Sequence, residues 1–147
     1  MFEEEFRTYD IDAPEVRALQ RAMPQETFAL VEGLMGRWQQ AGMPLRPARR
    51  GFALQAPHGE RLTTVAWVYA PDRRHPVARI EVALDLLLRR GVDAEQIDQL
   101  RDDLTRFPTH IPGDSESLVE LPLSVELGGA DMERLASALV QFGLSLA

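Results

Sequence analysis

The sequence predicts an α+β domain, in which a two-layer arrangement places helices over an antiparallel sheet of about four strands. Three observations support this. Residues 77–86 alternate between apolar and polar side chains, the period of a strand with one buried face. Residues 62–69 are rich in β-branched and aromatic residues and offer a partner strand across a polar turn at 70–76. Amphipathic helical patterns precede and follow this hairpin, so N-terminal, middle and C-terminal helices are expected to cover the sheet.

Two further segments complete the predicted sheet. Residues 51–57 alternate and turn back at 58–60 into 62–69, which makes a three-strand antiparallel meander. A later strand is expected over 119–127, where every second residue is Val or Leu. Pro122 lies on the polar side of that strand and cannot donate a ladder hydrogen bond, so we expect it at an edge.

A helical interpretation of residues 77–90 stays open beside the strand. Pro76 can begin a helix, and Ile80, Leu84 and Leu87 have helical spacing. The alternation over eight residues and the Val and Ile content favour the strand.

Four segments carry apolar residues at helical spacing. They are residues 12–23, 25–41, 93–107 and 130–142. Asp12 is the expected cap of the first helix, and Gly42 the expected C-terminal cap of the second. Asp93 and Gln96 have the spacing of a capping box at the start of the third.

Composition bounds the function. The 147 residues predict one domain over 13–147, preceded by an acidic arm over 1–12. The net charge of −7 repels phosphate backbones, so no nucleic-acid partner is expected. There is no cysteine, which excludes disulfides and thiolate metal sites. All 16 basic residues are arginine, which excludes every mechanism that needs a lysine. The chain opens with acidic residues and has no apolar run of about 18 residues, so we expect a cytoplasmic protein and no membrane partner.

The most notable polar group is on the 77–86 strand, where Arg79, Glu81 and Asp85 share one face. Such a row suits ion pairing on a solvated sheet face. The alternative is a small metal-dependent, nuclease-like site in which Glu81 and Asp85 hold a divalent ion. Such sites normally have a second acidic residue and a basic residue, often lysine, close in the same strand. Because Ala83 stands two residues after Glu81, we favour the structural interpretation.

Other chemistry-bearing residues are scattered. His58, His75 and His110 fall in predicted loops and have no paired metal-ligand spacing. Arginine pairs occur at 49–50, 73–74 and 89–90, and we interpret them as separate solvated turns. No nucleophile motif and no glycine-rich phosphate loop is present, so the sequence predicts no catalytic residue and no cofactor.

Two more residues are candidates for binding. Trp38 lies on an aromatic and Met stripe of the second helix, a pattern typical of core, although a small-molecule pocket between this helix and the sheet would also use it. Pro122 and its edge strand are candidates for strand addition or edge-mediated dimerisation. The tentative binding residues are therefore Arg79, Glu81, Trp38 and Pro122.

The order of elements resembles a known family. A helix ending in the stretch 38–44 (WQQAGMP) precedes three strands and a helix, then 117–123 (SLVELPL) and a helix containing 132–139 (MERLASAL). Over residues 25–143 this resembles small acidic bacterial proteins of the type III secretion chaperone-like fold, including the sensory-transduction-regulator family. The asparagines typical of that family's middle helix are absent here. The resemblance implies a non-enzymatic protein, often dimeric, that binds other polypeptides.

The sequence therefore predicts a non-catalytic protein-binding, adaptor or chaperone-like domain that forms a homodimer. It would recognise a protein segment through its sheet or a helix face. The metal-dependent, nuclease-like enzyme is the alternative.

Overall fold

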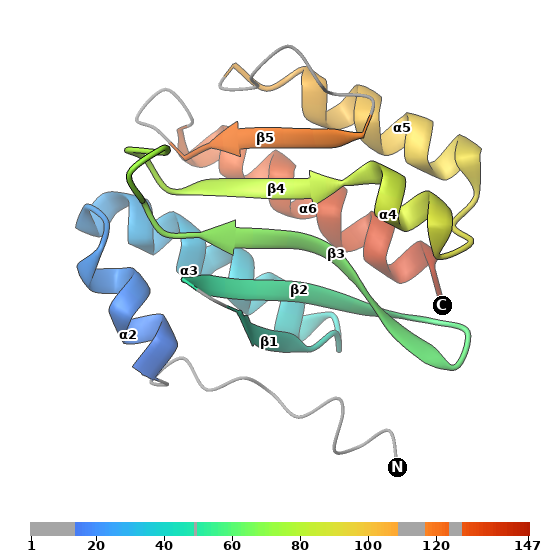
Figure 1. Cartoon of the computed structure of the whole chain (residues 1–147), viewed down its shortest axis with the longest axis horizontal. Coiled ribbons are helices and arrows are strands. Elements are labelled where there is room, and N and C mark those ends of the chain that lie inside the picture. The colour runs from blue at the N-terminus through green and yellow to red at the C-terminus, as the bar shows by residue number, and fades with distance from the viewer. Residues whose placement is uncertain (1–13, 49, 109–116, 124–127) are drawn as a thin grey trace.

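The computed structural model of the chain describes residues 14–48, 50–108, 117–123 and 128–147 (Figure 1). Their helices are α2 (Pro14–Arg21), α3 (Gln25–Gln40), α4 (Leu84–Arg89), α5 (Ala94–Thr105) and α6 (Gly129–Ser145). Their strands are β1 (Leu45–Ala48), β2 (Gly51–His58), β3 (Arg61–Tyr69), β4 (Arg79–Ala83) and β5 (Leu118–Pro122). The predicted α+β class is confirmed, while the acidic arm and the Asp12 cap lie outside the described residues.

The described strands form one antiparallel sheet in the order β1-β2-β3-β4-β5. The sheet has five strands rather than about four, because β1 was not predicted. With only four residues and Pro47 among them, β1 has a weak local signal, and it forms by pairing with β2. β2 begins at Gly51, where a Cβ would lie 1.8 Å from the Val68 carbonyl oxygen, so no larger residue fits.

The predicted strand over 77–86 is too long at both ends. β4 covers only Arg79–Ala83, and the chain then turns into α4, so the helical alternative is right for the second half. Leu84 and Leu87 are buried at helical spacing, which stabilises this turn of helix. Asp85 lies in the first turn of α4, where its Oδ1 accepts the Leu86 N–H at 2.9 Å and a negative charge is favourable.

Two other local predictions are settled by hydrogen bonds. Gly42 has φ +85°, and the N–H groups of Gly42 and Met43 donate to the carbonyls of Gln39 and Trp38, which is the predicted C-terminal cap of α3. Asp93 is the N-cap of α5, but its side chain makes no capping bond. The Gln96 side chain instead donates to Ser145 Oγ at 3.0 Å, so the predicted capping box is wrong.

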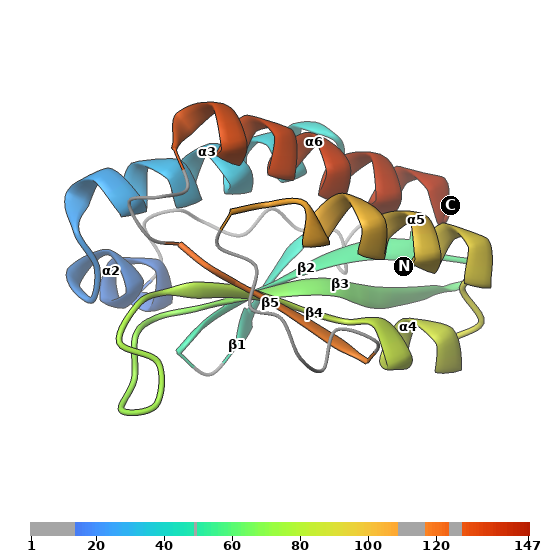
Figure 2. The same ribbon diagram turned by 90° about the horizontal axis from the view of Figure 1, so that it is seen from above.

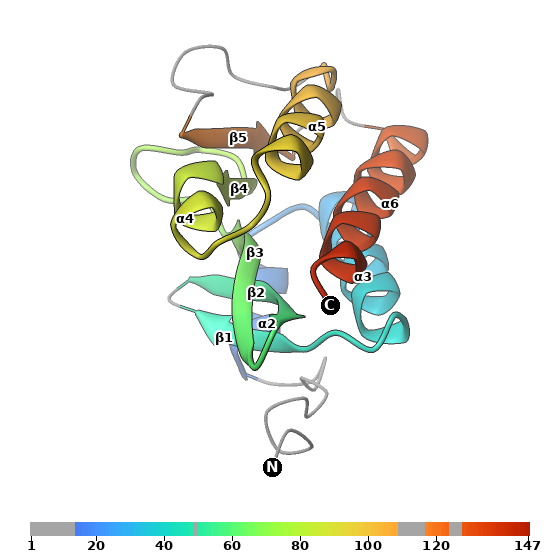
Figure 3. The same ribbon diagram turned by 90° about the vertical axis from the view of Figure 1, so that its right-hand side faces the viewer.

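The helices α3, α5 and α6 lie on the same side of the sheet (Figures 2 and 3). The side chains of Phe52, Val68, Ile80 and Leu121 are aligned across four strands beneath them, each at most 1 % exposed. Figure 1 looks onto the other side, where no described helix crosses the strands. On this side, the loop that precedes β4 and the helix α4 that follows β4 lie at opposite ends of that strand (Figure 2).

Candidate functional site

The sheet surface away from α3, α5 and α6 carries an unusual set of side chains. The strand register aligns Arg46, Ala53, Trp67, Glu81 and Glu120 in one row across all five strands. The next row brings Tyr69 beside Arg79. We call the surface formed by Arg46, Ala53, Trp67, Tyr69, Arg79, Glu81 and Glu120 the helix-free face. Its aromatic and charged residues alternate along β3 and β4 with the core residues, because successive strand residues point to opposite faces.

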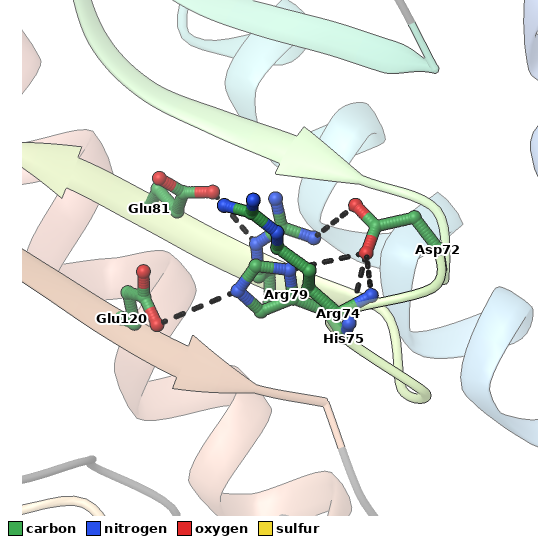
Figure 4. Close-up of polar contacts among 6 residues, drawn as sticks. All are labelled: Asp72, Arg74, His75, Arg79, Glu81 and Glu120. Atoms are coloured by element: carbon green, nitrogen blue, oxygen red, sulfur yellow. Dashed lines mark hydrogen bonds and ion pairs between the residues drawn. The ribbon is translucent and has the colours of Figure 1, made fainter.

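Arg79 is the centre of a polar network on this face (Figure 4). Its Nε donates to Glu81 Oε2 at 2.6 Å, and its Nη1 lies 3.5 Å from Asp72 Oδ2. The guanidinium carbon lies 4.8 Å from the centroid of the Tyr69 ring, within cation–π range. The Arg79 side chain is only 10 % exposed, so its charge is compensated by these partners rather than by water.

The loop between β3 and β4 supplies the second half of the network. Asp72 Oδ1 accepts the backbone N–H groups of Arg74 at 2.9 Å and His75 at 2.8 Å, which closes the turn. His75 Nδ1 lies 3.2 Å from the same oxygen, and its Nε2 lies 3.9 Å from Glu120 on β5. The loop is thereby attached to the helix-free face at both β4 and β5.

Two pKa values on this face are shifted. The backbone N–H of His75 is the largest influence that lowers the pKa of Asp72, to about 2, and the Arg74 N–H, the His75 ring and the Arg79 charge act in the same direction. Burial raises the pKa of Tyr69, the Glu81 charge raises it further, and Arg79 opposes both. Asp72 is therefore held as the anion, and Tyr69 as the neutral phenol.

The four tentative binding residues lie in different surroundings. Arg79 and Glu81 are paired on the helix-free face, and Pro122 lies opposite Arg79 on the edge strand β5. Trp38 is fully buried, and its Nε1 donates to the carbonyls of Pro44 at 3.1 Å and Gln55 at 3.0 Å. Its indole is thus a core group tying α3 to the sheet.

Asp85 does not share the strand face with Glu81, contrary to the sequence prediction. It lies on α4 and accepts from Arg89 Nη2 at 2.8 Å. His58 and His75 stand at opposite ends of β3, and His110 lies outside the described residues. Within the described part of the chain, no group of three or more His, Asp or Glu side chains is placed to hold a metal ion.

Sequence reasoning missed the other polar and aromatic members of the site, namely Arg46, Trp67, Tyr69, Asp72, His75 and Glu120. A signal for the two aromatics was present, since Trp67 and Tyr69 are two residues apart and flank Val68, which places them on the face opposite the core. The contributions of the loop and of β5 depend on tertiary structure.

Two pockets outside this face lie beside α2. The first pocket has a volume of about 380 Å³, and its lining includes Met23, Pro76 and Val77. The second has a volume of about 430 Å³, and its lining includes Leu19 and Arg50. Both include Ala22 and Pro71. The first pocket is mostly apolar, and Arg50 is the charged side chain of the second, so together they offer few groups that could orient a small ligand.

No family model matches the chain, and neither a curated protein nor a solved structure does. The resemblance to the type III secretion chaperone-like fold therefore stays a prediction. None of the described helices has the length and apolar character needed to cross a membrane.

Proposed function

We propose that the chain is a non-catalytic protein-binding domain of adaptor or chaperone-like type, and that the helix-free face is its binding surface. The observation that carries the proposal is the Arg79 network beside Trp67 and Tyr69. Tryptophan, tyrosine and arginine are the residue types that dominate binding energy at protein interfaces. Here all three are adjacent on a sheet surface that no described helix covers.

The network also prepares this surface for binding. Ordering flexible side chains is a major cost of association, on the order of 1 kcal/mol for each long side chain. Arg79 is already held by Glu81, Asp72 and Tyr69, so this cost is incurred when the domain folds. A partner would meet a rigid surface.

The charges along the row define the partner's chemistry. Arg46 lies at the β1 end, Trp67 in the middle and Glu120 at the β5 end, while Glu81 is already paired with Arg79. A complementary polypeptide segment would place an acidic group beside Arg46, an apolar group over Trp67 and a basic group beside Glu120.

The strand edges fit a binding role less well than the face. Each edge strand contains a proline, Pro47 in β1 and Pro122 in β5. The Leu123 N–H donates to the Ala78 carbonyl at 2.7 Å, so by the alternation of an antiparallel ladder the nitrogen of Pro122 faces the outer edge. An added strand would lack that donor, which disfavours strand addition at β5.

Selection of peptides from a random phage-displayed library on the purified chain tests the proposal. Selected peptides should be enriched in segments with separated acidic and basic ends, and Trp67→Ala and Arg46→Glu should each weaken their binding about tenfold or more. Leu144→Ala is the matched control, because Leu144 is an exposed apolar residue (51 %) on α6 in the helical layer. Peptides that bind both face variants as tightly as the wild type would overturn the proposal.

The expected homodimer would use the same face, because each copy offers both charged ends of the row. Light scattering after size exclusion should then show a dimer for the wild type and a monomer for Arg46→Glu. The charge swap Arg46→Glu with Glu120→Arg should restore the dimer, since opposite charges would face each other again. If the wild type is a monomer, the partner of the helix-free face is a different polypeptide and not a second copy of the chain.

A further inference from the structure

A small pocket gathers basic side chains at the end of β3 that is remote from the Asp72 loop. It has a volume of about 170 Å³ and is lined by His58, Arg61, Leu62, Thr63, Arg89 and Arg90. His58 ends β2 and the next three of these residues begin β3, while Arg89 and Arg90 lie at the end of α4. Three guanidinium-bearing residues thus meet at one cavity in a chain whose net charge is −7.

These arginines are available to a ligand. The side chains of Arg61 and Arg90 are exposed and form no ion pair or hydrogen bond with the described part of the chain. Arg89 pairs with Asp85 at 2.8 Å, but its side chain is 75 % exposed, and such pairs on a helix surface are weak. The lining of the pocket, as described, contains no carboxylate.

Two further polar groups in the pocket have unused hydrogen-bonding capacity. Thr63 is only 4 % exposed, and its hydroxyl has no hydrogen-bond partner among the described residues, which is rare for a buried polar group. His58 Nδ1 lies 3.1 Å from the Leu146 carbonyl oxygen. Because a carbonyl only accepts, this nitrogen carries the proton, and Nε2 stays free on the side of Gly91.

We propose that this pocket binds a phosphate-type oxyanion, held by Arg61, Arg90 and the Thr63 hydroxyl. The fork of a guanidinium group matches the oxygens of phosphate, and the two unpaired guanidinium groups of Arg61 and Arg90 compensate its charge. The volume is below the roughly 300 Å³ at which sites for drug-sized ligands begin, so the pocket encloses the anion and not the body of a larger molecule. Since the net charge of the chain repels anions, binding depends on these residues alone.

Calorimetric titration with inorganic phosphate and with phenyl phosphate tests the proposal, with sodium chloride at matched ionic strength as the salt control. Arg61→Gln and Arg90→Gln should each weaken phosphate binding about tenfold, the effect of losing one charge-assisted hydrogen bond. Arg73→Gln is the matched control, because Arg73 is an exposed arginine in the β3–β4 loop, and it should bind as the wild type does. Tighter binding of phenyl phosphate would identify a phosphate ester as the ligand, and equal binding the free ion.

Thr63→Val separates binding from folding. Removal of a buried hydroxyl without a partner should leave the unfolding midpoint unchanged or higher, while phosphate affinity falls. The proposal is overturned if sodium chloride reproduces the phosphate signal, or if the double variant Arg61→Gln with Arg90→Gln retains wild-type affinity.

Discussion

The two faces of the sheet are built from alternate residues of the same strands, yet they are buried by different means. On the face beneath α3, α5 and α6, Val68 and Ile80 are fully buried among apolar side chains. On the helix-free face, Arg79 is almost as buried, but by ion pairs and an aromatic ring. Each face also has a tryptophan. Trp38 packs on the covered face and is fully buried, whereas Trp67 lies on the helix-free face and is half-buried.

This difference bears on what each face contributes to the stability of the fold. Apolar burial contributes about 25 cal/mol for each Å² removed from water, so the covered face supplies most of the folding free energy. Partly buried charges lose hydration that their partners only offset, and an apolar replacement of such a pair is often neutral or stabilising. The helix-free face is therefore poorly explained by stability alone, and this supports our proposal that it is a binding surface.

The largest effect should come from Trp38, and Trp67 is its counterpart on the helix-free face. Trp38→Ala should lower the free energy of unfolding by about 3–5 kcal/mol, since it leaves a cavity and removes the donor to two buried carbonyls. Trp67→Ala should cost on the order of 1 kcal/mol, because its ring is only partly removed from water. Urea unfolding measures both. Equal losses would show that the helix-free face contributes to the core as much as the covered face.

A smaller effect is expected at Arg79. Arg79→Met should cost about 3 kcal/mol, because it leaves Glu81, whose side chain is 16 % exposed, without its cation. The double variant Arg79→Met with Glu81→Met should recover most of this loss, since no unpaired charge remains.

The matched control is Arg89→Met, which breaks the exposed pair with Asp85 and should cost about 0.5 kcal/mol or less. If the double variant is as unstable as Arg79→Met alone, the network stabilises the fold, and our assignment of this face to binding loses its main support.

Local signals explain what the sequence could predict. The helix α3 ends within one residue of its predicted end, because Gly42 at φ +85° is a local stop. The edge position of Pro122 is also confirmed, since its missing N–H is a property of the residue itself. The end of β4 was missed, because alternation and helical spacing coincide over 80–87 and packing decides between them.

The candidate site was only half predictable for a related reason. Arg79 and Glu81 are two residues apart on one strand, so their common face follows from the period of the strand. Glu120 joins them through the pairing of β4 with β5, strands that are separated by α4 and α5. Asp72 joins them through a loop whose closure depends on its own side chain. Neither strand register nor loop closure can be read from the pattern of one segment.

The smallest effect expected is a pH dependence of stability that arises from Asp72 in the loop between β3 and β4. The pKa of Asp72 is lowered from its usual 3.8 to about 2, so the folded state favours the carboxylate. The stability that it contributes is complete above the usual pKa and is lost as the pH falls through about 2. Asp72→Asn should thus lower the unfolding midpoint at neutral pH. The difference in midpoint between this variant and the wild type should become smaller as the pH falls from 3.8 to about 2.

The origin of that shift can be separated by a second variant. The backbone N–H of His75 is its largest cause and the Arg79 charge its smallest, so Arg79→Met should retain most of the acid dependence. If Arg79→Met instead abolishes it, the loop is held to the helix-free face by charge and not by its own turn. A partner that formed its own ion pair with Arg79 would then be expected to release the loop. The rigid surface on which the proposed binding depends would be lost.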